Sequence, residues 1–531
     1  MSESSEQTTT ASGIPVKTIY TPKDLNKLDY DKDLGIAGQP PFTRGPYTTM
    51  YRGQTWTIRR LSGYNTPEDS NKLYREEYAL GQTGFSVAPD ISTAIQLDAD
   101  DPRVEAEIGH SGLPLNTIED VETAFKGLPI DKVSTYLAER GPITAMYFAA
   151  AEKWGMDLKQ LRGTTSGCML SWACLNIPLQ PPPTAYRRYG TDFVEWCAEV
   201  APKWNPINFD SYNPRDLGLN AYEELGVLFA CAIDFIEEEK RRGRIPLDRF
   251  VKKISFNTAA HNDFFEEIAK LRAARRMWYK IVTQRYGIQD PNCAKFRVHV
   301  QSSGSTHTYQ EPYNNLIRIA YQTLAAVLGG AQSIHANGYD EAVCLPTEQS
   351  MLLSIRTEQI AALETNVTNT IDPLGGSYYV ESLTNELEER AFGYIKKIED
   401  MGGMAQAMES GWYHNLLKEK PIERQAKIES GKIPIVGVNI FRAEKAPYKV
   451  PIFRPDPAGS QKIQAEKLRL FREERDKRKY AEAMKRLVKA CKSDENVYPY
   501  VFEAVKAGAT LGEVSKAQLD AYGEWPYPIG L

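Results

Sequence analysis

The sequence predicts an α/β protein in which parallel strands alternate with amphipathic helices and form a (β/α)8 TIM barrel. Three observations predict this fold. Strand-like segments recur at intervals of about 30 to 45 residues, helical patterns lie between them, and no GxGxxG motif follows the first strand. Because that motif is missing, a doubly wound open sheet ranks second. The prediction adds an N-terminal arm and a C-terminal helical extension.

The elements follow in chain order. Eight segments are strand candidates, the last of them weak: 84–89, 132–138, 162–167, 206–212, 253–258, 296–303, 332–337 and 369–372. Amphipathic helical patterns cover 141–154, 221–242, 261–286, 313–328 and 347–365. The segment 44–66 is rich in Arg, Tyr, Thr and Gly, and it is typical of an extended, hydrogen-bonding segment outside the core.

The segment 296–304, FRVHVQSSG, has two different faces when it is drawn as a strand. Side chains alternate along a strand, so one face carries Phe296, Val298 and Val300. The other face carries Arg297, His299, Gln301 and Ser303. Buried strands of parallel sheets are usually apolar on both faces. The polar face therefore needs water or a ligand beside it.

Other strand candidates repeat this pattern of small polar residues. The segment 164–166 is Thr-Thr-Ser, and two further strands place polar residues on a common face: Ser255 with Asn257, and Ser333 with His335 and Asn337. Barrels of this type usually fill their interior with Val, Ile and Leu. We therefore expect a polar interior with room for an extended ligand along the axis, provided that the strand registers are right.

The predicted domains are a flexible arm over residues 1–40, the barrel over 41–400, and a linker with a helical region over 401–531. Residues 1–13 are predicted to form a disordered tail. In the last part, 445–459 is a proline-rich extended strap, 460–491 is a highly charged helix, and 498–522 forms one or two short helices.

Composition excludes several functions. The formal charge of −5, from 64 basic and 69 acidic residues, argues against a nucleic-acid or membrane surface. Seven cysteines without a CxxC pair indicate free thiols in a reducing compartment. We find no membrane-spanning run, secretory signal, or His/Asp cluster with metal-ligand spacing. The sequence predicts a cytoplasmic protein that uses no metal site of its own.

Five motifs resemble the methylmalonyl-CoA mutase family, and together they extend from about residue 42 to residue 522. They are PYTTMYRGQTWTIRRLSGYNTPEDSN, FFEEIAKLRAARRMW, RVHVQSSG, GGAQSIHANGYDEAVCLPT and IDPLGGSYYVESLT. The resemblance implies a large, substrate-binding subunit of an adenosylcobalamin-dependent acyl-CoA mutase, in which a coenzyme A thioester threads through the barrel.

The resemblance also implies a partner. The family's cobalamin domain carries a DxHxxG motif, and none of the six histidines of this chain has Asp two residues before it. We therefore expect adenosylcobalamin to be carried mainly by a separate small subunit that contacts the C-terminal region. A heterotetramer of two large and two small subunits follows from the family.

The resemblance assigns binding residues by position. Those matching the coenzyme A and substrate channel are Tyr47, Thr49, Met50, Thr57 and Arg59, with Gln54 where the family often has Arg. Arg272 and Arg275 match helpers for the coenzyme A phosphates, and the alternative is an exposed helix face with Glu partners. Gln301 matches the cobalamin face, and Glu341 and Ala342 match a cobalamin-contacting loop.

The catalytic residues implied by the resemblance include one substitution. His299 matches a position at the substrate thioester. Asn213 stands where the family has a histidine that hydrogen-bonds the thioester carbonyl. Asn can donate a hydrogen bond to that carbonyl but cannot donate a proton, and losing one such donor costs about 10²–10³ in rate.

Further departures from the family concern the substrate. Leu61 stands where methylmalonyl-CoA mutases have Tyr, and Ala88 stands where hydroxyacyl-CoA mutases have Asp, so a hydroxylated substrate is less expected. Ser166 and Ala138 are smaller than the family's residues and widen the pocket. Arg188, or its neighbour Arg187, matches the arginine that binds a substrate carboxylate.

These departures predict a mutase for a substituted succinyl-CoA/malonyl-CoA pair with a bulky alkyl or aryl group, such as the (2-aminobenzyl)malonyl-CoA type. The alternatives are a methylmalonyl-CoA, isobutyryl-CoA or 2-hydroxyisobutyryl-CoA mutase. From another class, a catalytically degenerate barrel could act as a binding partner, and Asn213 supports that alternative best.

Overall fold

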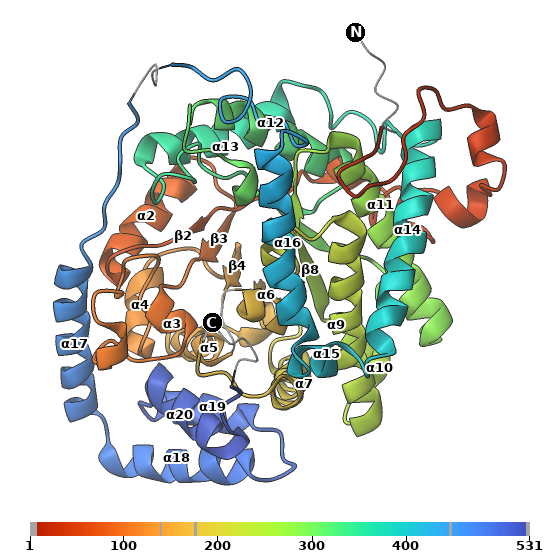
Figure 1. Cartoon of the computed structure of the whole chain (residues 1–531). Helices are drawn as coiled ribbons and strands as arrows, with labels where there is room; N and C mark the ends of the chain where they lie inside the picture. Colours follow the sequence, from red (N-terminus) through yellow and green to blue (C-terminus); the bar gives the residue numbers. More distant parts are fainter. Residues whose placement is uncertain (1–7, 139–140, 175–177, 445–448, 527–531) are drawn as a thin grey trace.

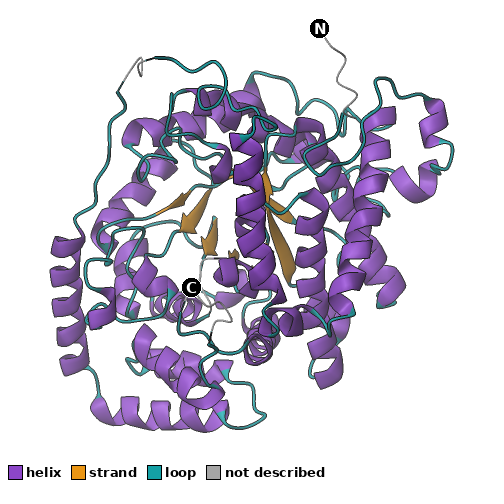
Figure 2. Cartoon of the chain, viewed as in Figure 1, coloured by secondary structure: helices purple, strands orange, loops and turns teal. Residues whose placement is uncertain are grey.

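The strands lie at the centre of the molecule and helices surround them (Figure 2). The computed structural model describes residues 8–138, 141–174, 178–444 and 449–526. In this part of the chain the strands are β1 (Thr57–Ile58), β2 (Leu61–Ser62), β3 (Gly84–Val87), β4 (Ser134–Leu137), β5 (Gly163–Thr165), β6 (Trp204–Asn205), β7 (Ile207–Asp210), β8 (Ile254–Ala260), β9 (Val298–Ser302) and β10 (Ser333–His335).

These strands form two five-stranded parallel sheets. Their orders are β1–β10–β9–β8–β7 and β2–β3–β4–β5–β6. β1 and β2 belong to one extended run, 57–62, and β6 and β7 belong to another, 204–210, so each sheet begins in the first run and ends in the second. The predicted α/β class is confirmed, and closure into one barrel stays a prediction.

The helices cover the sheets on their outer sides (Figure 1). They are α1 (Met50–Gly53), α2 (Pro67–Ala79), α3 (Ile91–Ala94), α4 (Ile118–Phe125), α5 (Pro142–Lys153), α6 (Met169–Cys174), α7 (Pro183–Val200), α8 (Tyr212–Asp216), α9 (Ala221–Arg242), α10 (Leu247–Val251), α11 (Phe264–Lys280), α12 (Asn314–Leu328), α13 (Glu348–Leu363), α14 (Tyr378–Glu399), α15 (Met404–Glu409), α16 (Trp412–Glu429), α17 (Pro457–Glu474), α18 (Lys477–Cys491), α19 (Tyr498–Lys506) and α20 (Leu511–Tyr522). No helix among the described residues is long and apolar enough to cross a bilayer.

Seven of the eight predicted strand segments contain a strand, and the weak candidate 369–372 is wrong. That segment forms turns before α14, and Asp372 has a φ of 48°, which a strand does not tolerate. The run 57–62 contributes strands instead, although the sequence analysis placed it outside the core. The buried arginines Arg59 and Arg60 hid its strand pattern.

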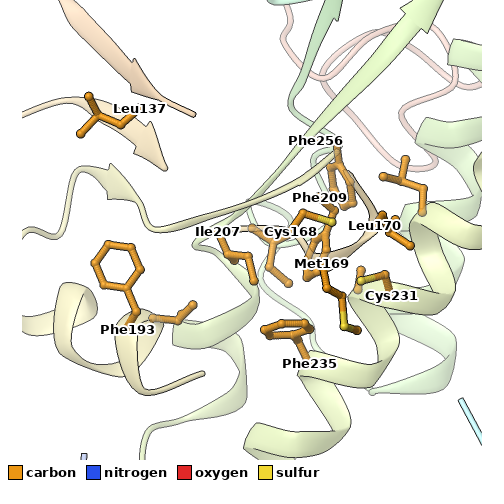
Figure 3. Packing of buried hydrophobic residues seen from close by; sticks show 14 of the residues in the cluster. Leu137, Cys168, Met169, Leu170, Phe193, Ile207, Phe209, Cys231, Phe235 and Phe256 are labelled. Atoms are coloured by element: carbon orange, nitrogen blue, oxygen red, sulfur yellow. The ribbon is translucent and has the colours of Figure 1, made fainter. Parts of the chain in front are cut away.

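The outer faces of the strands pack against the helices. On β8 the ring of Phe256 lies 4.9 Å from that of Trp278 on α11 and 6.2 Å from that of Phe209 on β7. Phe209 in turn contacts Phe235 on α9, with ring centroids 5.4 Å apart (Figure 3). Burying apolar and aromatic side chains is the main stabilising contribution to a fold of this size.

The N-terminal arm is docked from residue 8 onward, so the prediction of a disordered tail through residue 13 is wrong for residues 8–13. The Ser12 hydroxyl donates to Glu266 at 2.9 Å and accepts from the backbone N–H of Ala221 at 3.0 Å. Ile14 is buried in the core. Two backbone N–H groups of the arm, on Ala11 and Ser12, also donate to carboxylates at the start of α11.

Residues 445–448 of the predicted strap lie outside the described residues. In the described part that follows, 449–526, the chain forms four helices. The charged segment 460–491, predicted as one helix, is two, because the chain is extended at Arg475 and Asp476. Asp476 accepts hydrogen bonds from the first backbone N–H groups of α18 and so starts a new helix. The prediction of short helices within 498–522 is confirmed by α19 and α20.

Candidate functional site

One row of inward-facing residues crosses the first sheet. Paired residues of neighbouring parallel strands project from the same face, and the register aligns Thr57, Ser333, His299, Asn257 and Asp210. The His299 Nδ1 atom lies 2.8 Å from the Ser333 hydroxyl oxygen. Phe209, Phe256 and Val298 lie on the opposite face in the core, so this row faces the interior.

A second polar row crosses the other sheet. Its register aligns Leu61, Ser86, Tyr136, Thr164 and Asn205. The rings of Tyr136 and His299 are nearly parallel, at an interplanar angle of 20° with centroids 6.5 Å apart, so the two rows face one another. Apart from Leu61, the residues of both rows are polar, so the prediction of polar inner faces is confirmed for these rows.

Arg59 and His299 set the electrostatics of this interior. Burial lowers the pKa of Arg59 to about 10, which leaves the guanidinium charged at neutral pH. Burial, followed by the charge of Arg59, lowers the pKa of His299 to about 3. A neutral imidazole can donate one hydrogen bond and accept another. His299 is therefore suited to polarise a polar ligand group and not to supply a proton.

A cavity of about 590 Å³ opens at the amino ends of β1, β9 and β10. It brings together five of the predicted channel residues: Tyr47, Thr49, Met50, Gln54 and Thr57. Arg59 lies two residues beyond Thr57 on the same inward face, and its guanidinium donates to the Ser134 carbonyl at 3.4 Å. The cavity has a volume typical of small-molecule sites, and Thr57 belongs both to its wall and to the first inward row.

Other residues that line the cavity were not predicted from the sequence, and they include Tyr51, Trp56, Lys295 and Gln332. The Lys295 ammonium lies 5.5 Å from the centroid of the Tyr47 ring, so it supplies positive charge at the cavity. Lys295 could have been recognised from the sequence as a residue near the ligand, because it directly precedes the strand motif FRVHV. Tyr51 is fixed by a 2.6 Å hydrogen bond to the Ala331 carbonyl.

Arg272 and Arg275 lie behind the cavity wall on α11, and neither lines the cavity of about 590 Å³. The Arg275 guanidinium donates to the backbone carbonyls of Phe42 at 3.0 Å and Thr43 at 2.8 Å. Arg272 forms buried ion pairs with Asp372 and Glu381. Arg275 therefore fixes the segment that carries the cavity residues, and Arg272 acts on it through Asp372, which also pairs with Arg44 at 3.0 Å.

Several predicted residues meet at the carboxyl ends of the strands. The Gln301 amide donates to Asn337 Oδ1 at 3.1 Å, and the Asn337 amide donates to the Ser302 carbonyl at 2.8 Å. Glu341 and Ala342 follow β10 and line an open hollow of about 390 Å³. Burial raises the pKa of Glu341 to about 7, and the charge of Arg60 opposes that shift.

Asn213 is half-buried on α8, directly after β7. A buried ionic network fixes this helix. Arg215 donates to Glu267 at 2.8 Å and to the Leu219 carbonyl at 2.6 Å, and Lys270 pairs with Glu224 at 2.7 Å. Tyr212, beside Asn213, accepts a hydrogen bond from the backbone N–H of Gly304. The hydrogen bond between Gly304 and Tyr212 therefore joins the helix that carries Asn213 to the carboxyl end of β9.

The remaining predicted residues lie in different places. Leu61 is half-buried in the second inward row, and its backbone N–H lies 3.4 Å from His335 Nδ1. Ser166 follows β5, and the Tyr136 hydroxyl hydrogen-bonds its side chain. Arg188 lies on α7, and its guanidinium donates to the carbonyl of Ser493 beside α18. The structure does not bring Arg188 to the interior with the other residues.

Parallel strands with a polar inner face, a cavity at their amino ends and polar loops at their carboxyl ends are the features of an enzyme that takes an extended ligand between the two ends. A family model described as methylmalonyl-CoA mutase matches residues 9–524. The chain therefore belongs to the methylmalonyl-CoA mutase family and is an isomerase of the acyl-CoA mutase class.

Curated relatives match over nearly the whole chain. The 2-hydroxyisobutanoyl-CoA mutase large subunit of Aquincola tertiaricarbonis is 36% identical, over 98% of this chain and 93% of its own length. The methylmalonyl-CoA mutase of Rhizobium meliloti is 36% identical, over 97% of this chain and 72% of its own. The methylmalonyl-CoA mutase large subunit of Propionibacterium freudenreichii is 36% identical, over 98% of this chain and 72% of its own.

Proposed function

We propose that this chain is the large, substrate-binding subunit of an adenosylcobalamin-dependent acyl-CoA mutase that acts in the cytoplasm. One observation carries the proposal. The cavity lined by Tyr47, Thr49, Met50, Gln54 and Thr57 lies at the amino end of β1, where Thr57 is aligned with Ser333 and His299 in the first inward row. A thioester bound at the cavity would place its polar arm along the two inward rows.

The two sheets act in this proposal as halves of one (β/α)8 barrel. Hydrogen bonds on both sides of the shared runs support this arrangement. In the first run, Arg59 donates its backbone N–H to Ile334, and Ile58 accepts one from Thr83. In the second, Asn208 donates to the Ser166 carbonyl, and β7 pairs with β8. Closing the ring would remove exposed sheet edges and enclose the polar rows.

The carboxyl-end residues fit a large polar cofactor. The hollow of about 390 Å³ beside Glu341 and Ala342 is open and is formed by residues that follow β10. Gln301, Glu341 and Ala342 would contact adenosylcobalamin presented by a separate small subunit. That subunit would also contact residues 401–531, and two large and two small subunits would form a heterotetramer. When bound, that cofactor supplies an adenosyl radical by homolysis of its cobalt–carbon bond, which starts the carbon-skeleton rearrangement.

The chain's own residues would bind and orient the acyl group. His299 and Asn213 would donate hydrogen bonds at the thioester carbonyl, and the enclosed interior would exclude water from a reactive intermediate. Ser86 and Ser166 leave space for a bulky alkyl or aryl substituent. The expected free carboxylate of a succinyl-CoA/malonyl-CoA pair depended on Arg188 or Arg187. The Arg188 guanidinium contacts Ser493, and Arg187 pairs with Asp234 at 3.8 Å and Glu238 at 3.7 Å on α9. We therefore leave the carboxylate out of the proposal.

Reconstitution tests the proposal. The chain is combined with its small subunit and adenosylcobalamin, and turnover of methylmalonyl-CoA, isobutyryl-CoA and an arylsuccinyl-CoA is followed by mass spectrometry of the products. Cofactor-dependent isomerisation of any of them supports the proposal, and the fastest substrate defines the class. Coenzyme A binding by the chain without turnover of any acyl group would favour a non-catalytic binding partner.

A further inference from the structure

Asp210 is a buried acid in the interior that the proposed function does not yet use. It ends β7 and is aligned with Asn257 and then His299 across the sheet. Phe209, the residue before it, packs outward against Phe235 (Figure 3). Side chains alternate along a strand, so Asp210 faces inward. Its side chain is therefore on the same inner surface as the imidazole of His299.

The partners of Asp210 are neutral. Its Oδ1 atom accepts the backbone N–H of Tyr212 at 2.9 Å, and the Asn257 side chain donates to the carboxyl. The Ser171 hydroxyl donates to the backbone carbonyl of Asp210 at 3.3 Å. No ion pair to Asp210 occurs among the described residues. A buried carboxylate without a cationic partner is costly, and burial raises the pKa of Asp210 to about 6. A hydrogen-bond donor on a ligand would offset this cost.

The surroundings of Asp210 are rich in acceptors. The amide oxygens of Asn208 and Asn257 are buried, and neither has a hydrogen-bond partner among the described residues. The two residues are 3% and 5% exposed. Three acceptor groups therefore share one corner of the interior, and buried acceptors in folded proteins normally find donors. These acceptors favour the binding of a ligand that donates hydrogen bonds, and they disfavour the binding of a ligand with a free carboxylate.

We propose that Asp210 is a specificity-determining residue, which accepts a hydrogen bond from a hydroxyl or amino substituent on the acyl group. This inference rests on the proposed function, because that function places the acyl group beside His299. It assigns the chain a hydroxyacyl-CoA or aminoacyl-CoA thioester and disfavours a dicarboxylic one. Ala88, which argued against a hydroxylated substrate in the sequence, lies on a different strand end from Asp210.

The test compares four-carbon thioesters that differ only in their substituent. Dissociation constants of butanoyl-CoA, 3-hydroxybutanoyl-CoA, 3-aminobutanoyl-CoA and succinyl-CoA are measured by calorimetry with the full chain, and turnover is measured in the reconstituted enzyme. We expect the hydroxylated or the aminated compound to bind more tightly than butanoyl-CoA, and succinyl-CoA to bind least tightly. The two donor compounds distinguish a hydroxyl from an amine.

The variant Asp210→Asn keeps an oxygen for the Tyr212 N–H and removes the negative charge. We expect its preference for the donor-bearing compound over butanoyl-CoA to fall about 10- to 100-fold, the usual value of a hydrogen bond to a charged group. Succinyl-CoA should bind more tightly to the variant. Asp98→Asn, at a buried acid bonded to Thr510 and Gly512, is the matched control and should leave the preference unchanged.

The outcomes separate the two proposals. Binding of all four thioesters with the same preference in the wild type and in Asp210→Asn overturns the role of Asp210 and leaves the proposed function standing. Absence of any thioester binding overturns both. Should Asp210→Asn fail to fold, Asn208→Leu removes a neighbouring acceptor and should lower the same preference about 3- to 10-fold. An unchanged preference in that variant would overturn the role of this corner.

Discussion

The two faces of strands β8 and β9 show how one stretch of backbone can serve stability and function separately. Outward, Phe256 and Val298 are buried among aromatic side chains from the helices. Inward, Asn257 and His299 are polar, and an amide oxygen lacks a partner among the described residues. The difference teaches that the outer face contributes most of the packing, while the inner face keeps polar groups available for a ligand. The predictions below test that separation.

The largest effect is expected on the outer face. Phe256→Ala removes a ring that contacts Trp278, Phe209 and Phe296, and it should lower the free energy of unfolding by about 3–5 kcal/mol. Ser255→Ala, one residue earlier on the inner face, should cost about 1 kcal/mol, because it loses a hydrogen bond from Asn208 and a long one of 3.4 Å to the Ile207 carbonyl, but no aromatic packing. Urea denaturation measures both, and equal costs would remove the distinction between the faces.

A substitution on the inner face should lower turnover more than it lowers the free energy of unfolding. His299→Ala is expected to lower turnover by about 10²–10³, because it removes a polar group beside the acyl site, while the free energy of unfolding changes by about 1 kcal/mol or less. His110→Ala, at an exposed histidine, is the matched control and should leave both quantities unchanged. A large loss of stability in His299→Ala with normal turnover per folded molecule would refute this assignment.

The pH dependence of stability sharpens the same contrast. The folded-state pKa of His299 is lowered to about 3, below its unfolded value near 6.5. As the pH falls below 6.5, the unfolded chain takes up a proton that the folded chain does not. The folded state should therefore lose about 1–2 kcal/mol between pH 7 and pH 5 through this residue. His299→Asn should show a shallower loss in urea titrations at the two pH values, and an identical loss would argue against a neutral buried imidazole.

The smallest effect concerns the cavity. Lys295→Ala should raise the dissociation constant of coenzyme A about 3- to 10-fold, because it removes a cation beside Tyr47. The effect should shrink at high salt, since screening weakens the attraction. Lys252→Ala, at an exposed lysine paired with Asp290, is the control. Calorimetry at low and high salt would show whether Lys295 contacts the anionic end of the ligand, and equal changes in both variants would exclude a specific contact.

Alternating patterns made much of the fold predictable. The polar side of 296–303 was visible because apolar and polar residues alternate over the whole strand, and the structure confirms both faces. The run 57–62 was not recognised as strands, because Arg59 and Arg60 interrupt its apolar pattern. Their burial depends on tertiary partners such as Glu77, which lies 4.0 Å from Arg60. Local propensity carries no information about such partners.

The candidate site was predictable where a long motif fixed the positions of its residues. Five predicted residues of the segment 47–57 line one cavity, and their role in binding stays a prediction. Arg188 was placed by counting along a stretch with few matching residues, and it lies on α7 against Ser493. Asp210 was missed because a single acid at a strand end has no pattern, and only the register with Asn257 reveals its direction.

The contact of Arg275 with main-chain carbonyls has an evolutionary consequence. Its guanidinium hydrogen-bonds the backbone carbonyls of Phe42 and Thr43, so this contact does not depend on the side chains of the segment. Mutations between residues 44 and 57 can therefore change which thioester the cavity binds, while the segment keeps its hydrogen bonds to Arg275 on α11. A protein engineer could randomise Gln54 and Thr55 first and leave the helix untouched.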